Sequence, residues 1–567
     1  MGSAGMIKKV CEIVLSGERE LVVVVSAIGD TTDLLERAIE SSVDGSGDYM
    51  QPYNQMKQKH LDMVRALFPS ARQPDLIGKM HLEFKKGGYI LEGIHMLNEA
   101  SAKSKDRILS IGEQVSALIL SEYMNLYASG VKLFDATELI HIRPSGRGGE
   151  VVYESTMAGI RRAWSGFSGI GVVPGFIGGG EDGSVRTLGR GGSDLTASLI
   201  SEALEAELLT LWSDVSGMYT ADPRIVPDAF CIDKVSYEEA LEMSYFGAGV
   251  LYPPSVLPAL RSKIPIDIKN TFQSDNPGTQ IREHTQDHRI VKGLSSISNI
   301  SMVTLIGGGM VGVAGIASRT FSCLSELQIS VIFISQSSSE HSICMGIQTD
   351  HLQEAVNGLK REFAGEINSR MIDSVIGESG FAIIALVGQN MLNTPGISGK
   401  LFQSLGYNGI NVHAIAQGSS ERNISAIIKA EDVSKALNLL HEDFFLSDRK
   451  KIHLFVAGTG NVGEQFIRLI EEQQEDFRSE FNLEFVLAGI SNSRKMLIRE
   501  EGIAWDRALQ ELDEQGKQAK LDDFFKEMTS LNLRNSVFVD NTASEDVGNL
   551  YERVLEQSIS IATCNKI

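Results

Sequence analysis

Residues 187–194 read TLGRGGSD, and a second glycine-containing run, PGFIGG, lies just before them at residues 174–179. Glycine has no Cβ atom, so backbone N–H groups in such runs can approach a phosphate closely. The lysine spacing of a P-loop is absent here, which indicates a phosphate-binding loop of a different design. Strand and helix signals alternate around these runs up to about residue 285, and this pattern predicts a large α/β domain.

Two further stretches shape that expectation. Leu21 to Ser26 (LVVVVS) is a continuous β-branched and aliphatic run, typical of a buried parallel strand. Helical patterning with polar faces fills much of residues 54–130. Both features fit a parallel sheet covered by helices.

A second glycine loop lies in the last part of the chain, where residues 456–463 read VAGTGNVG. It follows an apolar strand predicted at 452–457 and opens an amphipathic helix predicted at 462–473, which is the context that a dinucleotide fingerprint needs. A glycine turn without a ligand is the alternative. The predicted cofactor-binding residues of the loop are Gly458, Thr459, Gly460, Asn461, Val462 and Gly463.

The next predicted strand, 485–490, ends in residues that favour one dinucleotide over another. Ser491 and Arg494 stand where an acidic residue would bind the ribose 2′-hydroxyl of NAD. Hydroxyl and guanidinium groups suit a 2′-phosphate, so we expect NADP(H) in preference to NAD(H).

Residues 298–447 contain an internal repeat of short β and α elements. The segment ISQSSSEHSI from Ile334 recurs 81 residues further on as IAQGSSERNI from Ile415, with six of ten positions identical. Two related small α/β domains follow, and each presents a glutamine, Gln336 or Gln417, in a polar loop. A glutamine among small polar residues suits recognition of an amino acid, and a solvated turn is the alternative. The charged run 447–451 is predicted to be a hinge.

Bulk composition narrows the class of protein. The 567 residues are too many for one core, and a net charge of −21 argues against a nucleic-acid or anionic-membrane partner. The five cysteines show no metal-ligand spacing, so we expect no metal site in the protein itself. No apolar run reaches transmembrane length and no signal peptide is visible, which leads us to expect a cytoplasmic protein.

The first region resembles the amino-acid kinase fold, and within it aspartate kinase. The resemblance rests on PGFIGG and TLGRGGSD together with TTD at 31–33, IGE at 111–113, WSDVSGMYTADPR at 212–224, and FGA with LYP at 246–253. It implies transfer of a phosphoryl group from ATP with Mg²⁺ to the carboxylate of aspartate, a reaction that needs positioning and charge neutralisation more than a base.

The resemblance also implies roles for individual residues. Glu113 would bind the substrate ammonium group, Arg190 its carboxylate, and Asp194 would orient groups near the transfer; these three are the predicted catalytic residues. Thr31 and Ser193 would also contact substrate. The residues expected at ATP are Gly191, Gly192, Ser213, Asp214, Tyr219 and Arg224.

The remaining regions resemble two further families. The repeat resembles tandem ACT domains, which bind amino-acid effectors and build homo-oligomers; threonine is the implied effector at Gln336 and Gln417. Residues 451–567 resemble the nucleotide domain of homoserine dehydrogenase through VAGTGNVG, AGISNSR (488–494), DNTAS (540–544) and TCNK (563–566). Lys566 joins the expected cofactor-binding residues.

We therefore predict an α/β chain with an aspartate kinase domain at 1–285, tandem ACT domains at 286–447 and a partial Rossmann domain at 448–567. Its family would make 4-phospho-L-aspartate and reduce aspartate semialdehyde to homoserine with NADPH, under threonine control, in aspartate-family amino-acid biosynthesis.

Departures from the family pattern qualify this prediction. We expect the first kinase strand with its phosphoryl-binding lysine, and the dehydrogenase substrate domain, to be missing; Gly249 also stands where the family commonly has a lysine. Both reactions would then be impaired. A non-catalytic amino-acid-sensing, NADP-binding regulatory protein stays open, as does a different amino-acid kinase, such as one acting on glutamate or uridylate.

Overall fold

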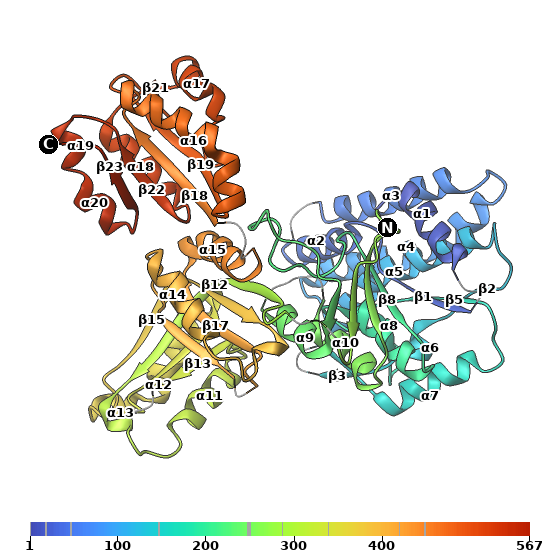
Figure 1. Ribbon diagram of the computed structural model, residues 1–567. Coiled ribbons are helices and arrows are strands. Elements are labelled where there is room, and N and C mark those ends of the chain that lie inside the picture. Colours follow the sequence, from blue (N-terminus) through green and yellow to red (C-terminus); the bar gives the residue numbers. More distant parts are fainter. Residues whose placement is uncertain are drawn as a thin grey trace. The chain divides into compact units, whose positions relative to one another are not determined.

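The computed structural model describes residues 2–17, 20–45, 48–145, 148–246, 251–285, 287, 289–337, 340–418, 420–446 and 450–566. The chain divides into two compact units, each described below by itself (Figure 1). The first comprises Met1–Met218, Cys231–Tyr245 and Gly249–Gln286, and the second comprises Tyr219–Phe230, Phe246–Ala248 and Asp287–Ile567. Two short segments within the predicted kinase domain, Tyr219–Phe230 and Phe246–Ala248, therefore belong to the second unit.

The first unit contains three sheets. β1 (Leu21–Val25), β5 (Ile170–Pro174) and β2 (Val131–Leu133) form a parallel sheet in the order β1-β5-β2. The predicted strand at 21–26 is therefore confirmed as parallel, although only Val25 in it is fully buried. The other sheets have the orders β8-β10-β11-β9 and β4-β3-β6-β7. Their strands are β3 (His141–Ser145), β4 (Gly148–Val151), β6 (Ile177–Gly180), β7 (Val185–Thr187), β8 (Leu209–Ser213), β9 (Lys234–Ser236), β10 (Ile266–Asn270) and β11 (Thr279–Arg282).

Helices supply most of the core of this unit. The predicted helical stretch 54–130 is confirmed as three long helices, α3, α4 and α5, whose apolar faces pack together with β1 and β5. A second cluster lies around α7 and α8. The helices are α1 (Ala4–Ser16), α2 (Thr31–Val43), α3 (Met50–Leu67), α4 (Gln73–Leu97), α5 (Ala102–Met124), α6 (Ala136–Leu139), α7 (Tyr153–Trp164), α8 (Gly192–Ala203), α9 (Tyr237–Tyr245) and α10 (Pro253–Arg261).

The repeat region forms one six-stranded sheet in the order β13-β14-β12-β15-β17-β16. Each copy runs strand, short 3₁₀ turn, helix, strand, strand, 3₁₀ turn, helix, as the repeat predicts. The strands are β12 (Gly293–Ile306), β13 (Phe333–Gln336), β14 (Ser342–Gln348), β15 (Ser374–Val387), β16 (Ala414–Gln417) and β17 (Asn423–Lys429). The helices are α11 (Ile316–Glu326), α12 (Leu352–Glu362), α13 (Ala364–Asn368), α14 (Ile397–Tyr407) and α15 (Val433–Phe445), and the 3₁₀ turns are Gly308–Met310, Thr349–His351, Gln389–Met391 and Ala430–Asp432.

The two copies share their central strands. The first half of β12 pairs with the second half of β15, as in Leu294↔Leu386, and the second half of β12 pairs with the first half of β15, as in Thr304↔Ile376. Each long strand thus serves both copies, with a register shift in β12 between Ile297 and Ile300. The copies are interleaved, a feature that their spacing in the sequence did not predict.

The last region is a doubly wound domain. Its sheet has the order β21-β20-β19-β18-β22-β23, and β18 pairs in parallel with both β19 and β22. Clusters containing α16 and α17 lie on one face and those containing α18, α19 and α20 on the other (Figure 1). The strands are β18 (Lys450–Ala457), β19 (Leu483–Ser491), β20 (Lys495–Ile498), β21 (Lys517–Gln518), β22 (Ser536–Asp540) and β23 (Ser560–Thr563). The helices are α16 (Asn461–Glu480), the 3₁₀ turn Trp505–Arg507, α17 (Ala508–Gln515), α18 (Leu521–Leu531), α19 (Glu545–Gly548) and α20 (Tyr551–Glu556).

Two expectations need comment. Lys450 and Lys451 already belong to β18, so the part of the predicted hinge that the structure describes is strand; residues 447–449 lie outside the described residues. Gly247, Ala248, Gly249, Ser338, Ser339 and Ser419 also lie outside them. Among the helices that the structure describes, none is both long and apolar enough to cross a membrane.

Candidate functional sites

The first glycine loop ends at the N-terminus of α8. Gly189 and Gly191 have φ of 76° and 69°, values that residues other than glycine rarely adopt. A Cβ atom on Gly191 would lie 2.7 Å from Cδ1 of Tyr252, so this position is crowded as well. Gly191 is the N-cap of α8 and provides no side-chain cap. The Gly192 N–H donates to the Gly189 carbonyl at 3.0 Å, so Ser193 and Asp194 are the first-turn residues of α8 whose N–H groups can meet an anion.

The loop packs against the end of β5. A Cβ atom on Gly175 would lie 2.8 Å from Cα, Cβ and Oγ of Ser193, so the backbone of residue 175 and the first turn of α8 touch. The Gly175 N–H donates to the Val25 carbonyl at 2.9 Å. The two glycine runs predicted from the sequence are therefore brought together beside the end of β1.

Asp194 and Arg190 differ in their surroundings. Burial raises the pKa of the Asp194 carboxyl group, which lies in the first turn of α8. Arg190 is exposed, with its guanidinium carbon 5.8 Å from the ring centroid of Tyr252. Arg190 can therefore turn toward a ligand, whereas the Asp194 side chain is partly buried.

Glu113 is a buried acid on α5. Its residue is 4% exposed, and its Oε2 atom has no hydrogen-bond partner among the residues that the structure describes. Burial raises the pKa of its carboxyl group to about 8, although a hydrogen bond from the Ala27 backbone opposes the shift. A buried carboxylate with an unpartnered oxygen is stabilised when a cation, such as an ammonium group, binds beside it.

Thr31 lies close to the Glu113 segment. A Cβ atom on Gly112 would lie 3.0 Å from both Thr31 Cγ2 and Ala27 Cβ. Thr31 is 1% exposed, and its hydroxyl group donates to the Ile28 carbonyl at 2.5 Å, which leaves the oxygen as an acceptor. Two buried polar residues, Thr31 at the start of α2 and Glu113 in α5, therefore lie near the end of β1.

The residues predicted to surround ATP are divided between the units. Ser213 ends β8 in the first unit and Asp214 follows it, and the Ser213 hydroxyl group donates to Asp214 at 3.0 Å. Tyr219 and Arg224 lie in the segment Tyr219–Phe230 of the second unit. Arg224 pairs with Asp222 at 2.6 Å, and this guanidinium lowers the pKa of the Asp222 carboxyl group. Residues 223–225 form a turn.

The second glycine loop fits the dinucleotide prediction. Gly458 has a φ of 93°, and a Cβ atom on Gly463 would lie 1.9 Å from the Gly458 carbonyl oxygen, so the third glycine allows helix and strand to pack. Gly460 is different, because a Cβ atom there would meet nothing within 4 Å. Gly460 is the N-cap of α16 and makes no side-chain cap, so the N–H groups of Asn461 and Val462 in the first turn have no partner within the helix.

The neighbouring strand ends supply the other predicted contacts. Ser491 ends β19, directly beside Ala457 of β18, and Arg494 is exposed in the turn that follows. Lys566 is also exposed, and the preceding residue, Asn565, donates to Asp540 at 3.1 Å. Because parallel strands end at one edge of the sheet, these side chains gather near the loop.

Asn541 is a candidate cofactor contact that sequence reasoning missed. Its backbone carbon lies 2.9 Å from a Cβ atom placed on Gly458, and its side-chain Nδ2 is buried without a partner among the described residues. A buried donor beside a phosphate-binding loop needs an acceptor. The signal was present in the DNTAS motif, to which no contact had been assigned.

The two glutamines of the repeat lie at the ends of equivalent strands. Gln336 ends β13 and Gln417 ends β16, and both are exposed. The strands approach each other, since the Ser335 hydroxyl group donates to the Ile415 carbonyl at 3.0 Å.

A glutamate braces each of these loops in the same way. Glu340 accepts from the Gly312 N–H at 2.8 Å, and Glu421 accepts from the Asn393 N–H at 2.9 Å. The repeat therefore extends to side-chain contacts and builds two matched polar loops.

Comparison with known proteins identifies the family. The amino acid kinase family matches residues 1–270, an ACT domain matches residues 303–363 and 384–444, and the NAD binding domain of homoserine dehydrogenase matches residues 458–567. The chain is 31% identical to aspartokinase 2, chloroplastic, of Arabidopsis thaliana, over 79% of this chain and 82% of that protein. The chain belongs to the aspartokinase family.

Longer relatives resemble this chain over its whole length. It is 33% identical to the bifunctional aspartokinase/homoserine dehydrogenase 2, chloroplastic, of Arabidopsis thaliana, over 100% of this chain and 63% of that protein. The crystal structure of E. coli aspartokinase III in complex with aspartate and ADP covers 78% of this chain and 98% of its own, with a TM-score of 0.67 and 26% identity. The protein is therefore a bifunctional aspartokinase/homoserine dehydrogenase-like chain that spans about 63% of the length of that relative.

The comparisons confirm the predicted family and fold class: an α/β protein with an amino-acid kinase domain, two ACT domains and a Rossmann-like NAD-binding domain. The domain boundaries and the individual site residues stay predictions. The same holds for NADP over NAD, for threonine as effector and for a cytoplasmic location, since the plant relatives are chloroplastic by name.

Proposed function

We propose that the first unit carries an aspartate kinase site, which forms 4-phospho-L-aspartate from ATP and L-aspartate. The observation that carries this is Glu113, buried, with a free oxygen and a pKa raised to about 8. The ammonium group of aspartate is a cation that this buried carboxyl group would favour, and the E. coli relative bears aspartate and ADP in its structure. Arg190 would bind the aspartate carboxylate, and the first turn of α8 would receive phosphate.

Magnesium would enter this site with the nucleotide. Among the described residues, no three His, Cys, Asp or Glu side chains converge to hold a metal ion. Mg²⁺ is commonly held by substrate phosphates, water and one or two carboxylates, and Asp194 is a carboxylate close to the phosphate-binding turn.

Proton release upon aspartate binding tests this site. At pH 7 Glu113 is mostly protonated, so binding of an ammonium group beside it would release close to one proton per site. Calorimetry of aspartate binding in two buffers of different ionisation enthalpy measures that number. Glu113→Gln should bind aspartate weakly and release no proton, whereas Arg143→Gln, which breaks an exposed pair with Glu181, should match the parent. Binding without proton release in the parent chain would contradict the assignment.

The reaction itself needs a separate assay. A coupled assay with ATP and aspartate measures kinase turnover, and oxidation of NADPH by aspartate semialdehyde measures homoserine formation. The prediction that this chain is impaired in both reactions is tested by the same two assays. Tight binding of both nucleotides without turnover would favour the alternative, a non-catalytic amino-acid-sensing regulatory protein.

In the last region we propose an NADP(H) site of homoserine dehydrogenase type. The open space at Gly460, the uncapped start of α16 and the buried Nδ2 of Asn541 together support a bound pyrophosphate. Fluorescence titration with NADPH and NADH measures the preference. Equal affinity for both dinucleotides would contradict a role of Arg494 at a 2′-phosphate.

We propose threonine as the effector of the ACT loops at Gln336 and Gln417. The matched glutamines lie in loops that Glu340 and Glu421 hold to the Gly312 and Asn393 N–H groups, and this symmetry supports two equivalent amino-acid contacts. Threonine should raise the melting temperature and give a calorimetric signal that Gln336→Ala and Gln417→Ala each weaken. No signal with threonine, or an equal signal with lysine, would overturn this effector.

A homo-oligomer through the ACT region completes the proposal. Large apolar side chains are exposed at equivalent positions of both copies: Val311 (49%) and Leu392 (44%), Ile334 (48%) and Ile415 (44%). Repeated exposed apolar positions favour a second copy as partner. Light scattering coupled to size exclusion should show a dimer or larger assembly, and Ile334→Glu with Ile415→Glu should shift it to the monomer.

A further inference from the structure

The segment Tyr219–Phe230 belongs to the second unit, although the residues before and after it, Met218 and Cys231, belong to the first. Its Ala221 and Val226 are 2% and 0% exposed in the cluster that contains α15. The Thr220 hydroxyl group and His441 Nε2 are 2.8 Å apart, and Asn438 Nδ2 donates to the Ile225 carbonyl at 2.9 Å. The segment that carries the candidate ATP residues Tyr219 and Arg224 is therefore anchored on α15.

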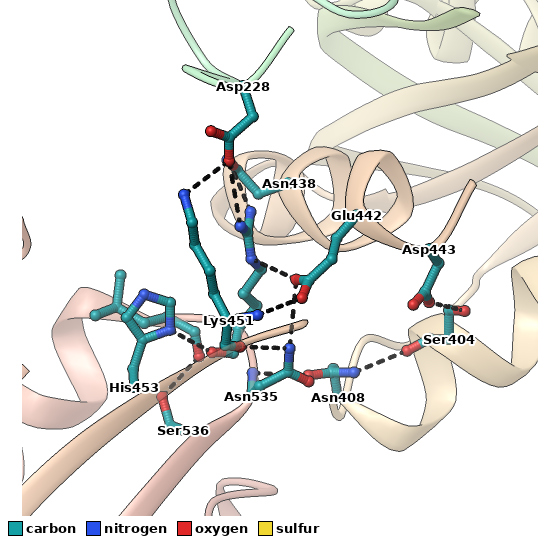
Figure 2. Close-up of polar contacts among 12 residues, drawn as sticks. Asp228, Ser404, Asn408, Asn438, Glu442, Asp443, Lys451, His453, Asn535 and Ser536 are labelled. Carbon is teal, nitrogen blue, oxygen red and sulfur yellow. Dashed lines mark hydrogen bonds and ion pairs between the residues drawn. The ribbon is translucent and has the colours of Figure 1, made fainter. Parts of the chain in front are cut away.

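Asp228, near the end of this segment, faces two cations of the dinucleotide-binding domain. Its Oδ2 lies 2.9 Å from Lys451 Nζ and 3.7 Å from Arg534 Nη2. Figure 2 shows Asp228 directed toward the Lys451 side chain, with Asn438 and Glu442 of α15 beside them. Three stretches that are distant in sequence thus meet at one group of charges.

The centre of this group is buried. Arg534 and Glu442 have side chains 7% and 4% exposed and approach to 2.9 Å in an ion pair. Arg534 also donates to Asn438 Oδ1 at 2.9 Å, and the Lys451 backbone N–H donates to the Glu442 carboxylate. Separating these groups would leave buried charges without partners, so the arrangement favours all contacts made together or none.

The same cations lie at the foot of the strands that carry the dinucleotide loop. Lys451 is in β18, which leads directly to Gly458, and Arg534 precedes β22, which leads directly to Asn541. These strands pair in register from His453↔Ser536 to Ala457↔Asp540. The charged group and the dinucleotide loop therefore occupy opposite ends of one rigid strand pair.

We propose that Asp228, Glu442, Lys451 and Arg534 form a coupling site that makes binding at the dinucleotide loop and at Tyr219 and Arg224 mutually dependent. The proposal rests on the two nucleotide sites proposed above. A shift of β18 and β22 upon dinucleotide binding would displace Lys451 and Arg534, and Asp228 would carry that change into the segment with the ATP residues. Coupling of this kind is reciprocal, so each ligand changes the affinity of the other by the same factor.

The test measures that factor. The dissociation constant of a non-hydrolysable ATP analogue with Mg²⁺ is determined by calorimetry with and without saturating NADP, and the reverse titration is then made. We expect a change of about fivefold or more in the parent chain, equal in both directions. In Asp228→Asn and in Lys451→Met the factor should fall to within about twofold of one, while NADP alone binds as in the parent.

Arg499→Gln is the matched control, because it breaks an ion pair with Glu511 inside the dinucleotide-binding domain. This variant should keep the coupling factor even if its melting temperature falls, which separates coupling from mere stabilisation. Independent binding of both nucleotides in the parent chain, or an unchanged factor in Asp228→Asn, would overturn the coupling alone. Failure of the parent to bind either nucleotide would overturn both this proposal and the proposed function.

Discussion

The two glycine loops solve the same problem with different geometry. In the first, Gly189 and Gly191 both have positive φ, and Gly191 is also crowded by Tyr252. In the second, the demands are separated: Gly458 provides the positive φ, Gly463 the close packing, and Gly460 the open space. A glycine that structure requires and a glycine that a ligand requires can therefore be told apart in the second loop, but not at Gly191.

The largest expected effect comes from Gly463→Ala. Its Cβ atom would lie 1.9 Å from the Gly458 carbonyl oxygen, a clash with backbone that no rotamer relieves. We expect a loss of about 3 kcal/mol or more of local stability. Hydrogen exchange of β18 and β22, followed by mass spectrometry, measures it. Unchanged protection of these strands would show that the close contact is not a structural requirement.

Glu113→Gln should have the next largest effect, and it depends on pH. The folded pKa of Glu113 is raised to about 8 from an ordinary value of 4.5, so the contribution of this group to stability is fully present below 4.5 and is lost as pH rises toward 8. At pH 7 this loss is on the order of 3 kcal/mol, and the neutral amide avoids it. Urea unfolding of the parent and of Glu113→Gln between pH 5 and pH 8.5 measures this difference in the free energy of unfolding. A variant with the same pH slope as the parent would contradict the assignment.

Local pattern explains what could be predicted, and long-range pairing explains what could not. The glycine loops, the strand at Leu21 and the repeat around Gln336 rest on neighbouring residues, so they could be found without a structure. The interleaving of β12 with β15 depends on pairs such as Leu294↔Leu386, which no local period specifies. The segment Tyr219–Phe230 belongs to the second unit because residues such as Val226 pack into the core near α15. An apolar residue signals burial but not the partner that covers it.

Gly460→Ala isolates the ligand from the fold and should have a smaller effect in free energy. Its φ of −73° suits alanine, and a Cβ atom meets nothing within 4 Å, so stability should be unchanged. The methyl group would occupy the space where a pyrophosphate approaches the start of α16, and we expect affinity for NADPH to fall about 100-fold, near 2.7 kcal/mol. Fluorescence titration measures the affinity for NADPH, and the melting temperature measures the stability of the variant. Retained affinity would place the pyrophosphate elsewhere, and lost stability would make this glycine structural, like Gly463.

Arg494→Ala should have the smallest effect, and it separates the ribose end of the site from the loop. Arg494 is exposed after β19, so its removal costs no buried contact and the fold should be unaffected. Loss of a guanidinium at a 2′-phosphate should weaken NADPH about 10-fold, near 1.4 kcal/mol, and leave NADH unchanged. Arg507→Ala, which removes an exposed arginine from a loose pair with Asp506 at 3.8 Å, controls for the lost charge of the domain. If both variants weaken NADPH binding equally, the attraction comes from the positive charge of the whole surface. If only Arg494→Ala weakens binding, and only of NADPH, the turn after β19 binds the 2′-phosphate that distinguishes the two dinucleotides. The glycine loop then binds the pyrophosphate that both dinucleotides share.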